Sequence, residues 1–387
     1  MKHWLCSLVV LAAFGFLHSA TAEEGKFWTY FGTYNGPLSE GIYVAEFDAA
    51  TGKLGVPKLA AKVKNPSFVA IHPQGKLMYA VNETSEFKKE KVGALSAFAI
   101  NPNDGTLTFL NDKSSGGAGP CHVSVDKAGK YVLAANYGGG SVCAYSLNAD
   151  GSLKEQTGFQ QHASTTVADK KKDPRAHSVN VSPDNRWAFV ADAGVDRIFV
   201  YRLNAETGAL TPHDPPFSAS TVDAAPRHFA FNYALKTPSG KLLAYANNER
   251  VGSLTSYEYD PERGTLQALQ TLPSQPVGAE VKGNSTAEVQ VHPTGKFVYV
   301  SNRGHNSIAI FRHDSATGEL SLVGHQGKDI NIPRNFSIDP SGKWAIVANQ
   351  ASNSVLVFSI DQTTGMLHPT EQKIELGSPV CVKFLKR

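Results

Sequence analysis

Six side chains capable of acid–base or anion chemistry occupy two adjacent positions of a phrase that recurs along the chain. Histidine and glutamate can transfer protons, and arginine can stabilise a developing oxyanion. Because burying unpaired charge is costly, a convergent set of such groups indicates an active site or a ligand-binding site. The six residues are His122, His177, Arg227, His228, Glu288 and Arg334.

The recurring phrase begins with a small residue or a proline and continues with apolar residues that alternate with polar ones. Its seven copies start 54, 56, 50, 60, 47 and 46 residues apart, at Pro66, Pro120, Ala176, Pro226, Thr286, Pro333 and Pro379. A period in this range indicates repeated structural units, each of which buries a hydrophobic core only by packing against its neighbours. In several copies a turn such as His72–Lys76 leads into a second apolar run.

Each unit contains four short β-rich runs, so the seven copies predict an all-β, seven-bladed β-propeller. The last copy supplies only one strand before the chain ends at Arg387. Three further strands are available near the N-terminus, at 27–33, at 41–47 and around Leu59. We therefore expect the last blade to be closed by N- and C-terminal strands, which removes an open sheet edge. Residues 23–387 are expected to form this single domain.

The first strand of each blade in a propeller runs along the central channel, and alternate residues face the channel. Aligned in this way, the six ionisable residues fall in two adjacent layers at one mouth of the channel, where Asn335 joins them. For any one of them alone, a rim residue that makes a hydrogen bond is the simpler interpretation. Their convergence in one cavity favours a functional site.

The N-terminus predicts a targeting segment. Lys2 and His3 precede an apolar stretch over 4–17, and residues 20–22 fit an A-x-A cleavage pattern. The stretch is too short for a comfortable membrane span. We expect residues 1–22 to be a signal peptide, cut after Ala22, and the mature protein to be periplasmic or secreted without a membrane anchor. Its three remaining cysteines, an odd number, are Cys121, Cys143 and Cys381; buried thiols are favoured over a bridge between Cys121 and Cys381.

A net charge of +3 on 387 residues does not indicate a nucleic-acid partner. The densest charge, Lys170–Lys172, is interpreted as a solvated loop, and 83–92 and 159–174 as loop excursions. Gly138–Gly140 is predicted to be a hairpin turn rather than a phosphate loop. The sequence lacks zinc-binding, P-loop, nucleophile-elbow and EF-hand motifs. A metal site of histidines is disfavoured because neighbouring arginines repel a cation, so no metal or cofactor is expected.

The chain resembles the lactonase family of seven-bladed propellers, which includes cytoplasmic 6-phosphogluconolactonases. The resemblance covers nearly the whole mature chain and is strongest in a few phrases. These are Cys121-His122-Val-Ser, Ala176-His177-Ser-Val-Asn-Val-Ser-Pro-Asp184, Ala225-Pro-Arg227-His228-Phe, Asn247-Asn-Glu249, Ala287-Glu288-Val and Pro333-Arg334-Asn-Phe. The targeting segment departs from the cytoplasmic members and favours the periplasmic gluconolactonases, which the chain also resembles.

The resemblance implies hydrolysis of a sugar lactone, glucono-1,5-lactone, by water. Glu288 or His228 would be the general base, Arg227 and Arg334 would stabilise the oxyanion, and His177 or His122 would protonate the ring oxygen. Further substrate contacts are expected at His122, Asn335, Glu249 and Arg303. Three alternatives remain open: a 6-phosphogluconolactonase, a muconate-type lactonising enzyme, and a propeller that binds a ligand or protein without catalysis.

Overall fold

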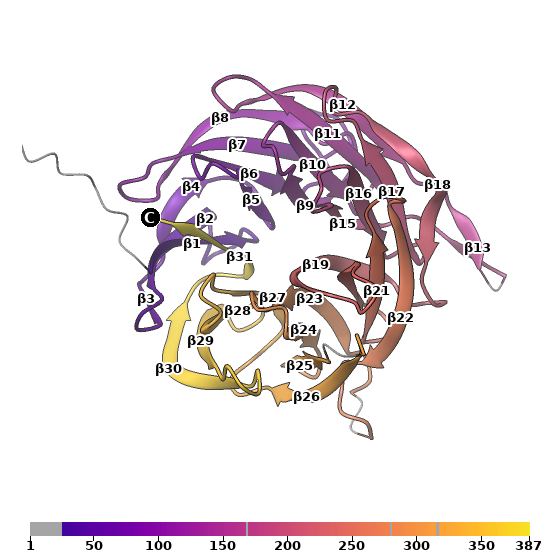
Figure 1. Cartoon of the computed structure of the whole chain (residues 1–387). Coiled ribbons are helices and arrows are strands. Elements are labelled where there is room, and N and C mark those ends of the chain that lie inside the picture. The colour runs from indigo at the N-terminus through magenta and orange to yellow at the C-terminus, as the bar shows by residue number, and fades with distance from the viewer. Residues whose placement is uncertain (1–24, 168, 279–280, 315–316) are drawn as a thin grey trace, which may run out of the picture.

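The computed structural model describes residues 25–387 except 168, 279–280 and 315–316. Within these ranges the regular elements are all β-strands, and they form seven antiparallel sheets around a central axis, plus one small hairpin (Figure 1). The predicted seven-bladed β-propeller is confirmed. The predicted signal peptide, residues 1–22, lies outside the described residues. No described segment is a helix of the length and apolarity that a membrane crossing needs.

Six blades consist of four consecutive strands, ordered from the channel outward. The first three are β5 (Val69–Ile71), β6 (Leu77–Asn82), β7 (Ala94–Ile100), β8 (Leu107–Ser114); β9 (Pro120–Val125), β10 (Tyr131–Asn136), β11 (Ser141–Leu147), β12 (Leu153–Gln161); and β15 (Ala176–Val181), β16 (Trp187–Asp192), β17 (Arg197–Leu203), β18 (Leu210–Ala219). The next three are β19 (Pro226–Lys236), β20 (Leu242–Asn248), β21 (Ser253–Asp260), β22 (Thr265–Pro273); β23 (Ser285–Val291), β24 (Phe297–Arg303), β25 (Ser307–His313), β26 (Leu320–Gln326); and β27 (Pro333–Ile338), β28 (Trp344–Asn349), β29 (Ser354–Ile360), β30 (Leu367–Glu375).

The seventh blade joins the two ends of the chain, as predicted. Its strands are β31 (Pro379–Lys386), β1 (Lys26–Thr33), β2 (Gly41–Asp48), β3 (Lys53–Leu54) and β4 (Lys58–Lys62). The C-terminal strand β31 is innermost and pairs antiparallel with β1, while β3 and β4 both pair with β2. The pairing of β1 with β31 closes the ring and covers the strand edges that these two terminal strands would otherwise expose.

The core lies between neighbouring blades, where the alternating apolar residues of one sheet pack on the next. Tyrosines of the second strands also tie the blades together: Tyr79 donates to the carbonyl of Gly151, and Tyr299 to that of Gly365, at 2.9 Å each. Both acceptors are turn glycines with positive φ, a conformation that glycine adopts without strain. Gly138–Gly140 forms the predicted hairpin turn, and the three cysteines among the described residues, Cys121, Cys143 and Cys381, are buried free thiols.

The interpretation of 159–174 as a loop excursion was wrong in part, because residues 159–161 are the end of β12 and a hairpin follows them. The excursion contains a two-stranded hairpin, β13 (Thr165–Val167) and β14 (Lys170–Lys172), which extends beside β18 in Figure 1. Lys172, expected in solvent, is only 8% exposed and forms an ion pair with Asp196. Lys172 is buried because it pairs with Asp196 and Asp223, which lie far from it in the sequence. The local density of lysines therefore does not predict its burial.

Candidate active site

A β-bulge at the start of the innermost strands turns two consecutive side chains toward the same mouth of the channel. In β15, Ala176 and Ser178 pair with β16, whereas His177 between them does not. The register shifts in the same way at the start of β9, β19, β23, β27 and β31. Consecutive side chains of a regular strand face opposite sides, and a bulge re-aims one of them. This is why Arg227 and His228, neighbours in the sequence, can contact each other.

Glu288 is a buried carboxylate surrounded by hydrogen-bond donors. Its Oε2 accepts from His228 Nδ1 at 3.0 Å and from Asn335 Nδ2, and its Oε1 accepts from the backbone N–H of Val289 at 3.1 Å. Burial alone would raise the pKa of Glu288, but His228 and two nearby cations hold it below its usual value. The carboxylate is therefore ionised at neutral pH and serves as an acceptor.

His228 lies between this carboxylate and a guanidinium. Its Nδ1 faces Glu288, and its Nε2 lies 3.3 Å from Nη1 of Arg227. Burial lowers the pKa of His228; Glu288 opposes this shift, and Arg227 adds to it. The partners assign the proton to Nδ1, since only that nitrogen faces an acceptor. The neutral ring then presents the lone pair of Nε2 toward Arg227.

Arg227 is a buried guanidinium whose hydrogen bonds are incomplete. Its Nη1 donates to the carbonyl of Ala287, but its Nε has no hydrogen-bond partner among the described residues and lies 3.6 Å from Glu249 Oε2. Glu249 Oε1 accepts from Arg303 Nη2 at 2.5 Å. Burial lowers the pKa of Arg227 to about 9, and the charges of Arg303 and Arg334 add to the shift. Arg227 is thus still charged at neutral pH and has a buried donor free for a ligand oxygen.

A second cation at the same mouth is held by the closing blade. Arg334 Nη2 donates to the Tyr34 hydroxyl at 2.9 Å, and its guanidinium lies 5.4 Å from the centre of the Tyr34 ring. The hydroxyl in turn donates to Glu83 Oε2 at 2.8 Å. Ser67 also donates to that carboxylate oxygen. This chain of contacts fixes Arg334 while its charge remains at the mouth.

Three histidines and a phenylalanine pack ring against ring in the channel. The ring centres of Phe68 and His122 are 4.3 Å apart, those of His122 and His228 5.5 Å, and those of His177 and His228 5.3 Å. Burial lowers the pKa of His122 and His177 well below the usual value. Both rings are therefore neutral at pH 7. Across the described ranges, no three His, Cys, Asp or Glu side chains are grouped to hold a metal ion.

A cavity of about 370 Å³ opens beside Glu249 at this mouth. This volume suits a ligand the size of a monosaccharide. The lining residues come from four blades and their connecting loops. They are Tyr137, Ala193, Ala225, Glu249, Arg250, Gly283, Asn284 and Ser285.

All nine site residues expected from the sequence lie in this connected region, through direct contacts or through the charges that shift their pKa values. Sequence reasoning missed Tyr34, Glu83 and Tyr137. A signal for them exists: each directly follows the last residue of a second strand, and Glu249 occupies the same position in its blade. Because these residues stand at the ends of the second strands, an alignment of the first strands does not include them; Glu249 and Arg303 are the members of this second ring that the sequence predicts.

The match to known proteins agrees with this architecture. Residues 28–384 match the family model described as lactonase, 7-bladed beta-propeller, and the chain belongs to that family. It is similar to the 6-phosphogluconolactonase of Bacillus subtilis, with 34% identity over 93% of this chain and 99% of the relative. Among solved structures it is similar to the periplasmic gluconolactonase of Pseudomonas aeruginosa, with 30% identity, a TM-score of 0.84, and coverage of 93% and 99% of the two chains. A structure described as a putative 6-phosphogluconolactonase from Bacteroides fragilis is 32% identical, with a TM-score of 0.83 and coverage of 94% and 99%.

Proposed function

We propose that this protein is an exported lactonase that hydrolyses an unphosphorylated sugar lactone, glucono-1,5-lactone, to its aldonic acid. The observation that carries the proposal is the placement of His228 between the Glu288 carboxylate and the Arg227 guanidinium. A neutral imidazole oriented by a carboxylate is a general base, and a buried guanidinium with a free donor suits an oxyanion.

His228 is the better base of the two residues expected in that role. Both carboxylate oxygens of Glu288 already accept hydrogen bonds within the protein, from His228, from Asn335 and from the backbone N–H of Val289. Nε2 of His228 has only the long contact to Arg227, which an entering water can replace. The contacts of a catalytic base are often loose before substrate binds.

The reaction then follows from these groups. Nε2 of His228 takes a proton as the water oxygen bonds to the lactone carbonyl carbon. Arg227 stabilises the negative charge on the carbonyl oxygen. The bond from carbon to the ring oxygen breaks, and the His228 imidazolium, paired with Glu288, returns its proton to that ring oxygen. His122 and His177 are neutral and are poor acids, so they shape the site rather than donate this proton.

Two lines of support bear on the substrate and the compartment. The pattern of residues 1–22 supports export, and sugar phosphates are metabolites of the cytoplasm. The similarity to the periplasmic gluconolactonase supports the unphosphorylated lactone. The names of relatives such as the Bacillus subtilis protein favour a second candidate, 6-phosphogluconolactone hydrolysis.

A pH-stat assay of the purified mature protein tests the activity. Glucono-1,5-lactone, its 6-phosphate and a muconate-derived lactone are compared after spontaneous opening is subtracted. Glu288→Gln and Arg227→Ala are each expected to lower the catalysed rate by about 100-fold or more. Glu262→Gln, at an 81% exposed side chain, is the matched control. Normal rates in both site variants would refute the proposed active site. A preference for the 6-phosphate would identify the phosphorylated lactone as the substrate in place of glucono-1,5-lactone.

The compartment is tested separately. The full chain is expressed with its N-terminus intact, and the protein from the periplasmic fraction is sequenced from its N-terminus. A start at Glu23 is expected. Protein that stays in the cytoplasm with residue 1 attached would overturn the proposed export.

A further inference from the structure

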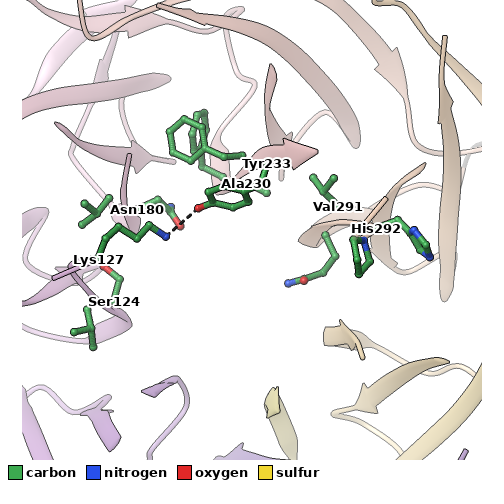
Figure 2. Close-up of a pocket in the computed structure, with 13 residues that line it drawn as sticks. Ser124, Lys127, Asn180, Ala230, Tyr233, Val291 and His292 are labelled. Carbon is green, nitrogen blue, oxygen red and sulfur yellow. Dashed lines mark hydrogen bonds between the residues drawn. The ribbon is translucent and has the colours of Figure 1, made fainter. Parts of the chain in front are cut away.

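A second cavity lies at the other mouth of the channel, and the proposed reaction does not use it. It has a volume of about 310 Å³ and is formed by the far ends of β9, β15, β19 and β23 (Figure 2). It shares no lining residue with the cavity beside Glu249. Its walls include Ala230 and Gln290, which stand two residues further along the strands than His228 and Glu288.

Between the two cavities the rings of Phe68, His122 and His228 contact one another. His122 and His228 stand two residues before Ser124 and Ala230 on their strands. A ligand in the second cavity therefore lies on the opposite side of these rings from Arg227 and Glu249. Binding there can be measured apart from binding at the proposed active site.

The charge of the second cavity selects an anion. Lys127 reaches across the mouth and donates to the Tyr233 hydroxyl at 3.0 Å, the bond drawn in Figure 2. Its ammonium also lies 5.1 Å from the centre of the Tyr233 ring. None of the thirteen described lining residues is acidic, so no carboxylate of the wall neutralises this cation. A ligand anion can therefore pair with it.

The deeper wall offers hydrogen bonds. Ser124 Oγ is buried and has no hydrogen-bond partner among the described residues. Such a group is costly unless a ligand or water satisfies it. Asn180 and Gln290, whose side chains are amides, also line this cavity, and Phe231 adds an apolar surface to it. Hydroxyls suit this wall because each can both donate and accept.

We propose that this cavity is a second binding site for a small polyhydroxy carboxylate of the aldonate class. The ligand carboxylate pairs with Lys127, and its hydroxyls bond to Ser124, Asn180 and Gln290. The volume is close to the lower end of the range for small-molecule pockets, which fits a molecule of this size. The choice of an aldonate rests on the proposed function, whereas the cavity itself selects a small hydroxylated anion.

Calorimetric titration of the mature protein with sodium gluconate tests the site, with glucose as the uncharged comparison. Two binding events per chain are expected. Lys127→Met should weaken one of them by about tenfold or more, the effect of losing a charged hydrogen bond. Arg227→Ala should remove the other. Lys130→Met, on the same turn and also exposed, is the matched control and should change neither.

The kinetic readout separates this proposal from the proposed function. Lys127→Met and Ser124→Val should leave kcat/KM for the lactone within about twofold, because neither residue contacts the proposed site. A single binding event that Arg227→Ala abolishes, or equal affinity in wild type and Lys127→Met, would overturn the second site. Glucose binding as tightly as gluconate would overturn the role of the charge. A protein that binds gluconate at the Lys127 site but has no lactonase activity would refute the proposed function alone.

Discussion

Replacing Lys172 with methionine is expected to destabilise the protein and to lower its activity, although Lys172 belongs to the hairpin of β13 and β14 and not to a channel strand. Its ammonium binds the Asp196 carboxylate and lies 2.8 Å from Asp223 Oδ1. Asp196 also accepts from the backbone N–H of Asp223 at 3.0 Å and of Ala225 at 2.8 Å. Ala225 O accepts from the N–H of Glu249 at 2.8 Å. The ion pair thus fixes the loop that leads into the strand of the site arginine.

The magnitude follows from burial. The side chains of Lys172 and Asp196 are 8% and 4% exposed, and removing one partner of a buried pair costs about 3–5 kcal/mol. The bridge to Asp223 adds little, because that side chain is 48% exposed. Asp196 keeps its two backbone donors, so we expect the lower end, about 3 kcal/mol. For a domain of this length the shift in Tm is roughly 4 °C.

Two measurements check this prediction. Thermal unfolding of Lys172→Met gives the stability loss, and the lactone assay at 25 °C, where the variant remains folded, gives the effect on kcat/KM. We expect kcat/KM to fall because the backbone before Arg227 and Glu249 loosens. Lys171→Met is the matched control, since that side chain is 73% exposed and pairs with an exposed aspartate. If the two variants have the same Tm and the same kcat/KM, the reasoning from burial is wrong.

Three further predictions concern the titration and the ligands of the site. Burial holds the pKa of His122, His177 and His228 below 6.5, so the unfolded chain binds protons that the folded chain does not; stability is full above about pH 6.5 and falls below it, by up to about 1.4 kcal/mol per pH unit for each histidine. A Tm that stays constant from pH 7.5 to 5.5 would contradict this. Asn335→Leu removes a donor to Glu288, so the pKa of Glu288 should rise; because the ionised Glu288 orients the base His228, the acid limb of the pH–rate profile should then move to higher pH, and an unmoved limb would contradict this coupling. Dialysis against EDTA should leave the lactone rate unchanged, because the site arginines repel a cation, and a loss restored by a divalent metal would refute that reasoning.

The repeat made the fold predictable, because apolar alternation and turn residues are local signals. The closure by both termini followed from the single strand left after Pro379. The direction of adjacent side chains did not follow from alternation. His177 and Ser178 should face opposite sides of a regular strand, and the bulge in β15 changes this.

Contacts between blades were the part that the sequence could not supply. Tyr34 and Glu83 belong to different blades, and their hydrogen bond exists only in the closed ring. Lys172 is buried by acidic residues 24 and 51 positions away along the chain. A local pattern of lysines contains no information about such distant partners.

The closing strand β31 also determines when the site can exist during synthesis. Val382 N–H donates to Asn335 Oδ1 at 2.9 Å, and the amide of Asn335 donates to Glu288. Val382 follows all the proposed site residues in the sequence, of which Asn335 comes last. The ribosome therefore synthesises every proposed site residue before the strand that completes the hydrogen bonds around Glu288, and a growing chain holds these residues without the arrangement that the proposed reaction needs.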